Sequence, residues 1–199
     1  KTVLELGGSN PFIVMPDADL ERAAVEACYS RFRDAGQSCN AAKRIVVTEA
    51  VADRFIPLFL AECAKLQTGD PKDPATTLAP LHREDLRANV HAQVQDAVAH
   101  GAEVLTGGFI PEGKGWFYPA TVLDKVNPDC RVWNEEVFGP VAMILRAKDE
   151  EHAVALANDT PYGLGASIYT ADTCRAWAFA EKIQAGSVFI NRHTSSDLR

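Results

Sequence analysis

The chain has 199 residues, of which 47% are hydrophobic and 24% charged, and its formal net charge is −7. This composition is ordinary for a globular protein. The acidic balance argues against nucleic acid and against an anionic membrane surface as partners, because both attract basic patches. No apolar run in the sequence is long enough to cross a bilayer.

Short apolar runs alternate with helical periodicities along the chain. In chain order we expect strands at residues 2–6 and 12–15, a helix at 18–34, a strand at 45–48, helices at 51–64 and 86–98, strands at 103–106, 118–123 and 141–145, a helix at 150–158, a strand at 166–169, a helix at 174–183 and a strand at 187–190. This alternation predicts an α/β fold, with a mostly parallel sheet and helices on both faces. We expect residues 1–199 to form one domain.

The five cysteines are an odd number, are widely spaced and include no Cys-x-x-Cys pair. They are Cys28, Cys39, Cys63, Cys130 and Cys174. This pattern favours reduced thiols in a cytoplasmic protein over a disulfide framework or a zinc site. The five histidines form no metal-spaced pair either, so we expect no metal.

Cys39 follows Gly36 in a polar stretch between the expected helix at 18–34 and the strand at 45–48. A nucleophilic thiol needs such an exposed turn, because the thiolate is the reactive form and apolar burial raises its pKa. Gly36 can adopt the backbone angles of a sharp turn, and the charges of Lys43 and Arg44 would help to ionise the thiol. The plainer interpretation is a small apolar residue that packs on a loop.

Two carboxylates are candidates to act with the thiol. In open α/β sheets the working residues lie at the carboxyl ends of strands, so we expect Glu5, at the end of the first expected strand, to meet Cys39 there. Flanked by apolar residues, Glu5 would have a raised pKa suited to a general base. The other, from the adjacent pair Glu135 and Glu136, precedes a shaped turn and could accept hydrogen bonds from a ribose diol. A surface glutamate and a solvated turn are the alternatives.

Five motifs in this order resemble the aldehyde dehydrogenase superfamily, and the resemblance runs from Lys1 to Arg199. They are Leu4-Glu5-Leu6-Gly7-Gly8, Gly36-Gln37-Ser38-Cys39, Glu135-Glu136-Val137-Phe138-Gly139-Pro140, Asn158-Asp159-Thr160-Pro161-Tyr162-Gly163-Leu164 and Phe189-Ile190-Asn191. Each motif alone is weak, but five in order make chance a poor explanation.

The resemblance implies roles for four residues and a cofactor. It implies that Cys39 is the nucleophile, Glu5 the general base, Glu136 the ligand of the nicotinamide ribose, and that Phe138 lines the nicotinamide site. The cofactor would be NAD or NADP, bound by a Rossmann domain that precedes Lys1. The chain would then be a catalytic-domain fragment, inactive by itself, of a homodimer or homotetramer.

The resemblance also implies covalent catalysis on a small-molecule aldehyde. The Cys39 thiolate attacks the carbonyl, a hydride leaves to NAD(P)⁺, and Glu5 activates the water that releases the acid from the thioester. The Cys39 backbone N–H and an amide from outside the chain would hold the oxyanion.

Arg33 and Ser196 are similar to the substrate contacts of the succinate-semialdehyde dehydrogenase branch. In that branch an arginine and a serine at these places grip the distal carboxylate, and the planar fork of arginine matches a carboxylate well. The plainer interpretations are a helix C-terminal arginine favoured by the dipole and a loop serine. Position 41, where some members of the branch carry a second cysteine, is Ala41.

Three other functions stay open at this point: a dehydrogenase for another small aldehyde, a cofactor-independent cysteine esterase that uses Cys39 and Glu5, and a non-catalytic domain. Turnover of succinate semialdehyde against butanal, ester cleavage without NAD(P), and selective alkylation of Cys39 discriminate among them.

Overall fold

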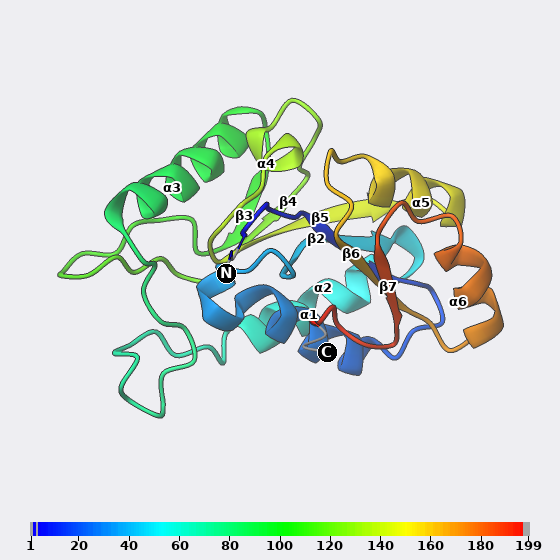
Figure 1. Ribbon diagram of the computed structural model, residues 1–199, viewed down its shortest axis with the longest axis horizontal. Helices are drawn as coiled ribbons and strands as arrows, with labels where there is room; N and C mark the ends of the chain where they lie inside the picture. Colours follow the sequence, from blue (N-terminus) through cyan, green and yellow to red (C-terminus); the bar gives the residue numbers. More distant parts are fainter. Residues whose placement is uncertain (1, 3, 197–199) are drawn as a thin grey trace.

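The computed structural model of the chain describes residue 2 and residues 4–196. Within this part, seven strands form one sheet in the order β3-β4-β5-β2-β1-β6-β7 (Figure 1). The strands are β1 Asn10–Val14, β2 Ala42–Thr48, β3 Glu103–Thr106, β4 Thr121–Asp124, β5 Val141–Ala147, β6 Gly165–Tyr169 and β7 Ser187–Ile190. The helices are α1 Leu20–Phe32, α2 Glu49–Cys63, α3 Glu84–Ala99, α4 Arg131–Asn134, α5 Glu150–Asn158 and α6 Thr173–Ala180, with a 3₁₀ turn at Arg33–Gly36.

The sheet is parallel except at one edge, where β3 runs antiparallel to β4. Every residue of β1 and β2 is buried, and β5 exposes only Arg146. Continuous apolar strands of this kind are typical of parallel sheets that are covered on both faces. The predicted fold class is therefore confirmed.

Helices cover the two faces in turn. Helices α1 and α2 pack against each other and against β1 and β2, whereas α5 packs over the same strands from the opposite face and α6 lies beside β6 and β7 (Figure 1). The β1-α1-β2 and β5-α5-β6 connections advance in opposite directions along the sheet. Right-handed crossovers in opposite directions place their helices on opposite faces.

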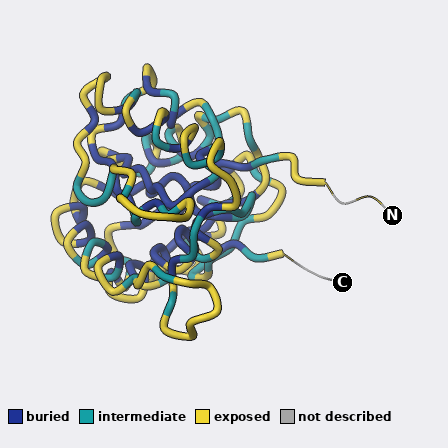
Figure 2. The backbone as a smooth tube through the Cα atoms, turned by 90° about the vertical axis from the view of Figure 1, so that its left-hand side faces the viewer, coloured by how far each residue is buried: buried dark blue, intermediate teal, exposed yellow. Residues whose placement is uncertain are grey.

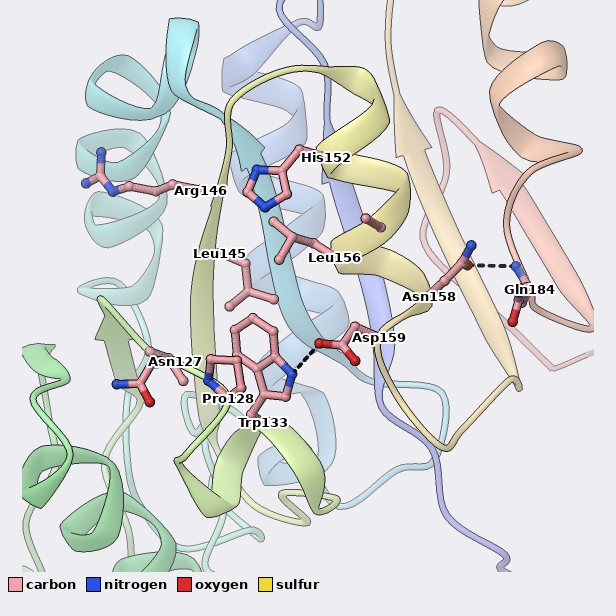
Figure 3. Close-up of a pocket in the computed structure, with 12 residues that line it drawn as sticks. Asn127, Pro128, Trp133, Leu145, Arg146, His152, Leu156, Asn158, Asp159 and Gln184 are labelled. Carbon is pink, nitrogen blue, oxygen red and sulfur yellow. Dashed lines mark hydrogen bonds between the residues drawn. The ribbon is translucent and has the colours of Figure 1, made fainter.

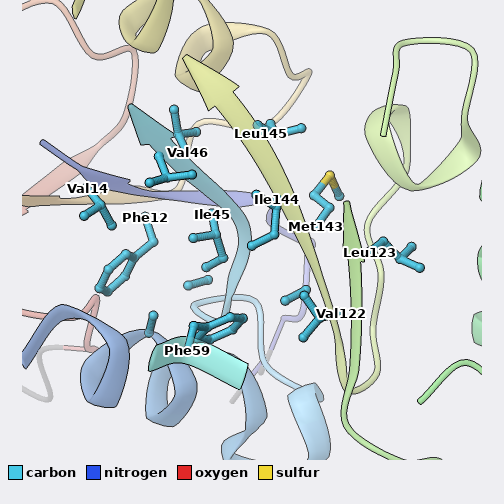
Figure 4. Close-up of a cluster of buried hydrophobic side chains, with 14 of the residues drawn as sticks. Phe12, Val14, Ile45, Val46, Phe59, Val122, Leu123, Met143, Ile144 and Leu145 are labelled. Carbon is cyan, nitrogen blue, oxygen red and sulfur yellow. The ribbon is translucent and has the colours of Figure 1, made fainter. Parts of the chain in front are cut away.

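Alternate side chains of β2 fill the two halves of the core. Ile45 faces Phe12 and Phe59 on the α1 and α2 side, whereas Val46 points to the other side with Leu145 (Figure 4). On the first side, the ring of Phe59 stacks on Phe55 and Phe32, with centroids 5.9 and 6.2 Å apart. Each fully buried side chain of this size contributes about 1.5–3 kcal/mol of hydrophobic free energy.

The strand expected at residues 2–6 does not form in residues 2 and 4–6, which have no regular structure. This segment lies beyond the amino end of β1, where no neighbouring strand pairs with it, and Gly7 turns the chain with φ 84°. Leu4 and Leu6 are 69% and 80% exposed. Figure 2 shows this exposed segment leaving the body on the same side as the residues after β7.

The other expected elements form within a few residues of their predicted positions. Helix α4, which was not predicted, has four residues, too few for a periodic apolar pattern. Across the described residues, no helix combines the length and apolar character needed to span a membrane.

Candidate active site

The loop that carries Cys39 turns sharply between α1 and β2. Asp34, Ala35 and Gly36 have positive φ angles of 54°, 53° and 72°. A β-carbon on Gly36 would lie 2.4 Å from the carbonyl oxygen of Gly139, so only glycine allows the two loops to approach this closely. Cys39 follows this turn and is partly exposed.

The candidate site lies at the amino ends of the parallel strands. Glu5 precedes β1, Cys39 precedes β2 and Glu136 precedes β5. The expectation that these residues meet at the carboxyl ends of strands is therefore wrong. Helix α1 returns the chain to the amino edge of the sheet, and the long connection before β2 presents the thiol there.

The Glu5 carboxylate lies near enough to the Cys39 thiol to affect its pKa. The Gly7 backbone N–H donates to Glu5 Oε1 at 3.3 Å and steadies this carboxylate. Burial first, and then the charge and hydrogen bond of Glu5, raise the pKa of the Cys39 thiol, while Lys43 acts in the opposite direction. The thiol therefore stays protonated at neutral pH, with a base beside it.

Lys43 and Arg44 point to opposite faces of β2, as adjacent strand residues do. The Lys43 ammonium donates to the carbonyls of Ser38 and Cys39, at 2.6 and 3.0 Å. Arg44 instead lies 5.6 Å from the ring of Trp133 on the other face. The expectation that both cations help to ionise the thiol is wrong for Arg44, and the lowering effect of Lys43 is outweighed by burial and Glu5.

Glu136 is fixed through one of its two oxygens. Oε1 accepts hydrogen bonds from Lys43 Nζ at 2.9 Å and from the Gly8 backbone N–H at 3.1 Å. Oε2 faces Gly7, where a β-carbon would lie only 2.9 Å away. The absence of a side chain at Gly7 therefore leaves space beside an oxygen that can accept further hydrogen bonds.

Four of the five sequence motifs converge at this place. A β-carbon on Gly8 would lie 2.5 Å from the carbonyl oxygen of Cys39 and 3.3 Å from Leu164, and one on Gly7 would lie 3.1 Å from Tyr162. The segment before β1 therefore packs against the thiol loop, the Glu136 loop and the loop before β6.

Two motif asparagines have structural roles instead. The Asn158 side chain bonds to the backbone of Lys182 and Gln184 at 2.9 and 2.8 Å. The Asn191 side chain bonds to both backbone groups of Thr170, at 3.0 and 2.8 Å. These contacts fix the connections around α6 and β7.

Phe138 is half-buried, and a fully buried arginine holds the backbone on both sides of it. Arg31 donates to the Val137 carbonyl at 3.0 Å and to the Gly139 carbonyl. Burial lowers the pKa of Arg31 to about 9, and the charge of Glu136 opposes this effect. Sequence reasoning missed Arg31, although a charge on the apolar face of a helix is a usable signal.

Of the two predicted substrate residues, Ser196 contacts the loop that carries Cys39, whereas Arg33 lines a pocket with Tyr29 and Glu62. The Arg33 guanidinium lies 5.9 Å from the ring centre of Tyr29, which in turn contacts the ring of His193. The Ser196 hydroxyl accepts a hydrogen bond from the side chain of Asn40, the residue after Cys39, at 2.7 Å. Arg33 and the segment that carries Ser196 are thus linked through Tyr29.

A cavity of about 710 Å³ lies elsewhere, between α4, β5 and α5 (Figure 3). Two pairs of its lining residues are hydrogen-bonded to each other: Trp133 Nε1 donates to Asp159 at 2.9 Å, and the Asn158 side chain accepts from the backbone of Gln184. Neither Cys39 nor Glu5 lines it. In the described part of the chain, no group of three His, Cys, Asp or Glu side chains is arranged to hold a metal ion.

Comparison with known proteins identifies the family. The sequence profile of the aldehyde dehydrogenase family matches residues 1–199. The chain belongs to the aldehyde dehydrogenase family. It is 48% identical over 199 residues to the succinate semialdehyde dehydrogenase [NAD(P)+] Sad of Escherichia coli, covering all of this chain and 43% of that protein. It is 50% identical to an aldehyde dehydrogenase of Paenarthrobacter nicotinovorans, covering 98% of this chain and 43% of that protein.

A solved structure agrees with this assignment. The succinic semialdehyde dehydrogenase from Streptococcus pyogenes in complex with NADP+ is 38% identical, with a TM-score of 0.93, over 96% of this chain and 42% of that chain. This aldehyde dehydrogenase chain thus spans less than half the length of the relatives it matches. The family predicted from the five motifs is confirmed.

Proposed function

We propose that the chain is the thiol-bearing part of an NAD(P)-dependent aldehyde dehydrogenase that oxidises succinate semialdehyde to succinate. The close packing of the segment that carries Glu5 against the Cys39 loop, where Gly8 lies against the Cys39 carbonyl, is the observation that carries this proposal. A thiol adds readily to a carbonyl, and a neighbouring carboxylate serves as the base that such a reaction needs. Family membership and the names of the relatives support the choice of reaction.

The chemistry proposed for these residues has two halves. The Cys39 sulfur bonds to the aldehyde carbon while its proton passes to Glu5, and the Cys39 backbone N–H donates to the developing oxyanion. A bound NAD(P)⁺ would supply the hydride acceptor that the oxidation of the Cys39 adduct to a thioester requires. Glu5 first releases the thiol proton to solvent and can then take a proton from water, whose oxygen attacks the thioester carbon. The carbon–sulfur bond breaks as the acid leaves, and Glu5 returns its proton to the sulfur.

The residues present fit a nicotinamide cofactor. Glu136 keeps Oε2 free of the bonds that hold Oε1, and Gly7 leaves space beside it. A carboxylate oxygen in such a space suits a ribose hydroxyl. We propose that Glu136 binds the nicotinamide ribose and that Phe138, held half-exposed between the two carbonyls that bind Arg31, lines the nicotinamide site.

We also propose that a Rossmann domain from another part of a longer polypeptide completes the cleft. The exposure of Leu4 and Leu6 on either side of Glu5 supports this, because an apolar pair beside a catalytic base suits a covered position. The relatives are more than twice as long as this chain. We propose a homodimer or homotetramer for the full-length enzyme, as in the family that the chain resembles.

For the substrate, we propose that Arg33 and Ser196 bind the distal carboxylate. Arg33 rests on Tyr29, and Ser196 lies beside Asn40. A guanidinium and a hydroxyl together offer the donors that a carboxylate accepts.

Steady-state kinetics of the full-length enzyme with succinate semialdehyde and with butanal test this function. We expect Arg33→Ala to lower kcat/KM for succinate semialdehyde by about tenfold to a hundredfold, because a charge-assisted hydrogen bond is lost. Its kcat/KM for butanal should change little, and Arg83→Ala, at an exposed arginine paired with Asp85, should leave both values unchanged. An unaltered preference in Arg33→Ala would exclude the clamp, and ester cleavage without NAD(P) that rivals aldehyde oxidation would favour a hydrolase.

A further inference from the structure

Lys43 is a buried cation whose ammonium group contacts the backbone of the loop that carries Cys39. Its side chain is 0% exposed, and Nζ lies 2.6 Å from the Ser38 carbonyl oxygen, 3.0 Å from that of Cys39 and 2.9 Å from Glu136 Oε1. A lysine ammonium has three N–H donors. These three acceptors therefore use all of them, and one nitrogen joins the loop before β2 to the loop before β5.

The contact with Ser38 fixes the direction of a catalytic N–H. The Ser38 carbonyl and the Cys39 N–H belong to the same peptide group, and in a trans peptide they point in opposite directions. The Ser38 carbonyl oxygen also accepts from the Ala41 backbone N–H at 3.1 Å. Because Lys43 draws this oxygen toward the core, the Cys39 N–H must point away from the core. This is the N–H that the proposed function assigns to the oxyanion.

Burial and the neighbouring charges make Lys43 easier to deprotonate than an exposed lysine. The charged and titratable groups that face it are Arg31 from α1, Glu136 from the loop before β5 and Cys39 from the loop before β2, while Glu5 faces Cys39 from the segment before β1. Burial and then the charge of Arg31 lower the pKa of Lys43 to about 8, against the opposite effect of Glu136 and Cys39. A neutral amine has only two N–H donors and would lose one of the three contacts.

We propose that Lys43 is a positioning residue that aims the Cys39 backbone N–H at the substrate oxygen and holds Glu136 for the cofactor ribose. The inference rests on the proposed function, because that function gives the N–H and Glu136 their roles. It adds that the oxyanion donor and the cofactor contact depend on one protonated nitrogen. The Cys39 N–H and the Glu136 carboxylate should therefore both become less well positioned as Lys43 loses its proton.

Kinetics of the full-length enzyme with Lys43→Met test the proposal. We expect kcat to fall about tenfold to a hundredfold, because a misdirected oxyanion donor loses much of its effect, and KM for NAD(P)⁺ to rise. Lys125→Met, at an exposed lysine paired with Glu103, is the matched control and should match the wild type. A folded Lys43→Met enzyme with kcat and cofactor KM within twofold of wild type would overturn the proposal.

The pH profile provides a second test that does not depend on the folding of Lys43→Met. In the wild type, kcat should decline as the pH rises through about 8, when Lys43 deprotonates. Glu136→Gln removes the carboxylate that sustains the lysine charge, so this decline should move to lower pH. A decline at the same pH in both enzymes would refute the role of Lys43. A wild type without aldehyde oxidation would instead refute the proposed function.

Discussion

Two neighbouring charges shift the pKa of the Cys39 thiol in opposite directions. Glu5 holds the proton on the sulfur through its charge and a hydrogen bond, whereas Lys43 favours the thiolate. The sequence places both charges but not their distances, since Glu5 and Cys39 are separated by the whole of β1 and α1. Both residues could therefore be singled out from the sequence, but the direction of the shift in the pKa of Cys39 could not.

Glu5→Gln should make Cys39 more reactive in this chain. Removing the negative charge lowers the pKa of the thiol, so more thiolate is present at pH 8, and alkylation by iodoacetamide should accelerate by about tenfold for each pKa unit. Peptide mass spectrometry measures the rate, with the exposed Cys174 as internal reference. Glu135→Gln, whose carboxylate pairs with Arg131, should have no effect. An unchanged or slower alkylation rate at Cys39 in Glu5→Gln would contradict the effect of Glu5 on the pKa of the thiol.

Gly8→Ala should disturb the thiol loop. The new β-carbon would lie 2.5 Å from the Cys39 carbonyl oxygen, so the backbone of one loop has to move. We expect a lower melting temperature and an altered alkylation rate at Cys39. Gly186→Ala is the matched control, because its β-carbon has only an ordinary contact at 3.5 Å. Equal melting temperatures and equal alkylation rates in the two variants would mean that the close approach of Gly8 to the Cys39 carbonyl does not matter.

At the scale of elements, burial decides which patterns can be read from the sequence. Strands β1, β2 and β5 were predictable because each contains a short apolar run inside a covered sheet. The run at residues 2–6 has a similar apolar content, but its described residues 2 and 4–6 have no neighbouring strand, so the same signal misleads there. A strand needs hydrogen-bonding partners, and their presence depends on the tertiary fold.

The packing of α2 on the sheet predicts a large stability effect at Phe59. Its ring is fully buried and stacks on Phe32 and Phe55. Phe59→Ala should lower the free energy of unfolding by about 3–5 kcal/mol through the lost burial and the cavity that remains. Trp177→Ala removes a larger ring that is 68% exposed and should cost far less. Urea denaturation of both variants measures the difference, and similar losses would contradict the packing described.

At the scale of the whole molecule, the fold brings distant loops to one edge of the sheet. The loops before β1, β2, β5 and β6 meet there because parallel strands share their amino ends. The family motifs named most of the residues that converge. They did not reveal the edge at which these residues meet, nor Arg31 and the contacts of Lys43, because those depend on which side chains the packing turns inward.

The central claim is that Cys39 carries the acyl group and that Glu5 helps to release it. The most direct measurement is mass spectrometry of the Cys39 peptide after the full-length Glu5→Gln enzyme reacts with succinate semialdehyde and NADP⁺. Because the base for hydrolysis is absent, a succinyl thioester should accumulate on Cys39 and should not accumulate in the wild type. A wild-type enzyme that oxidises the aldehyde, together with a Glu5→Gln enzyme that releases acid at the wild-type rate with Cys39 unmodified, would contradict the account.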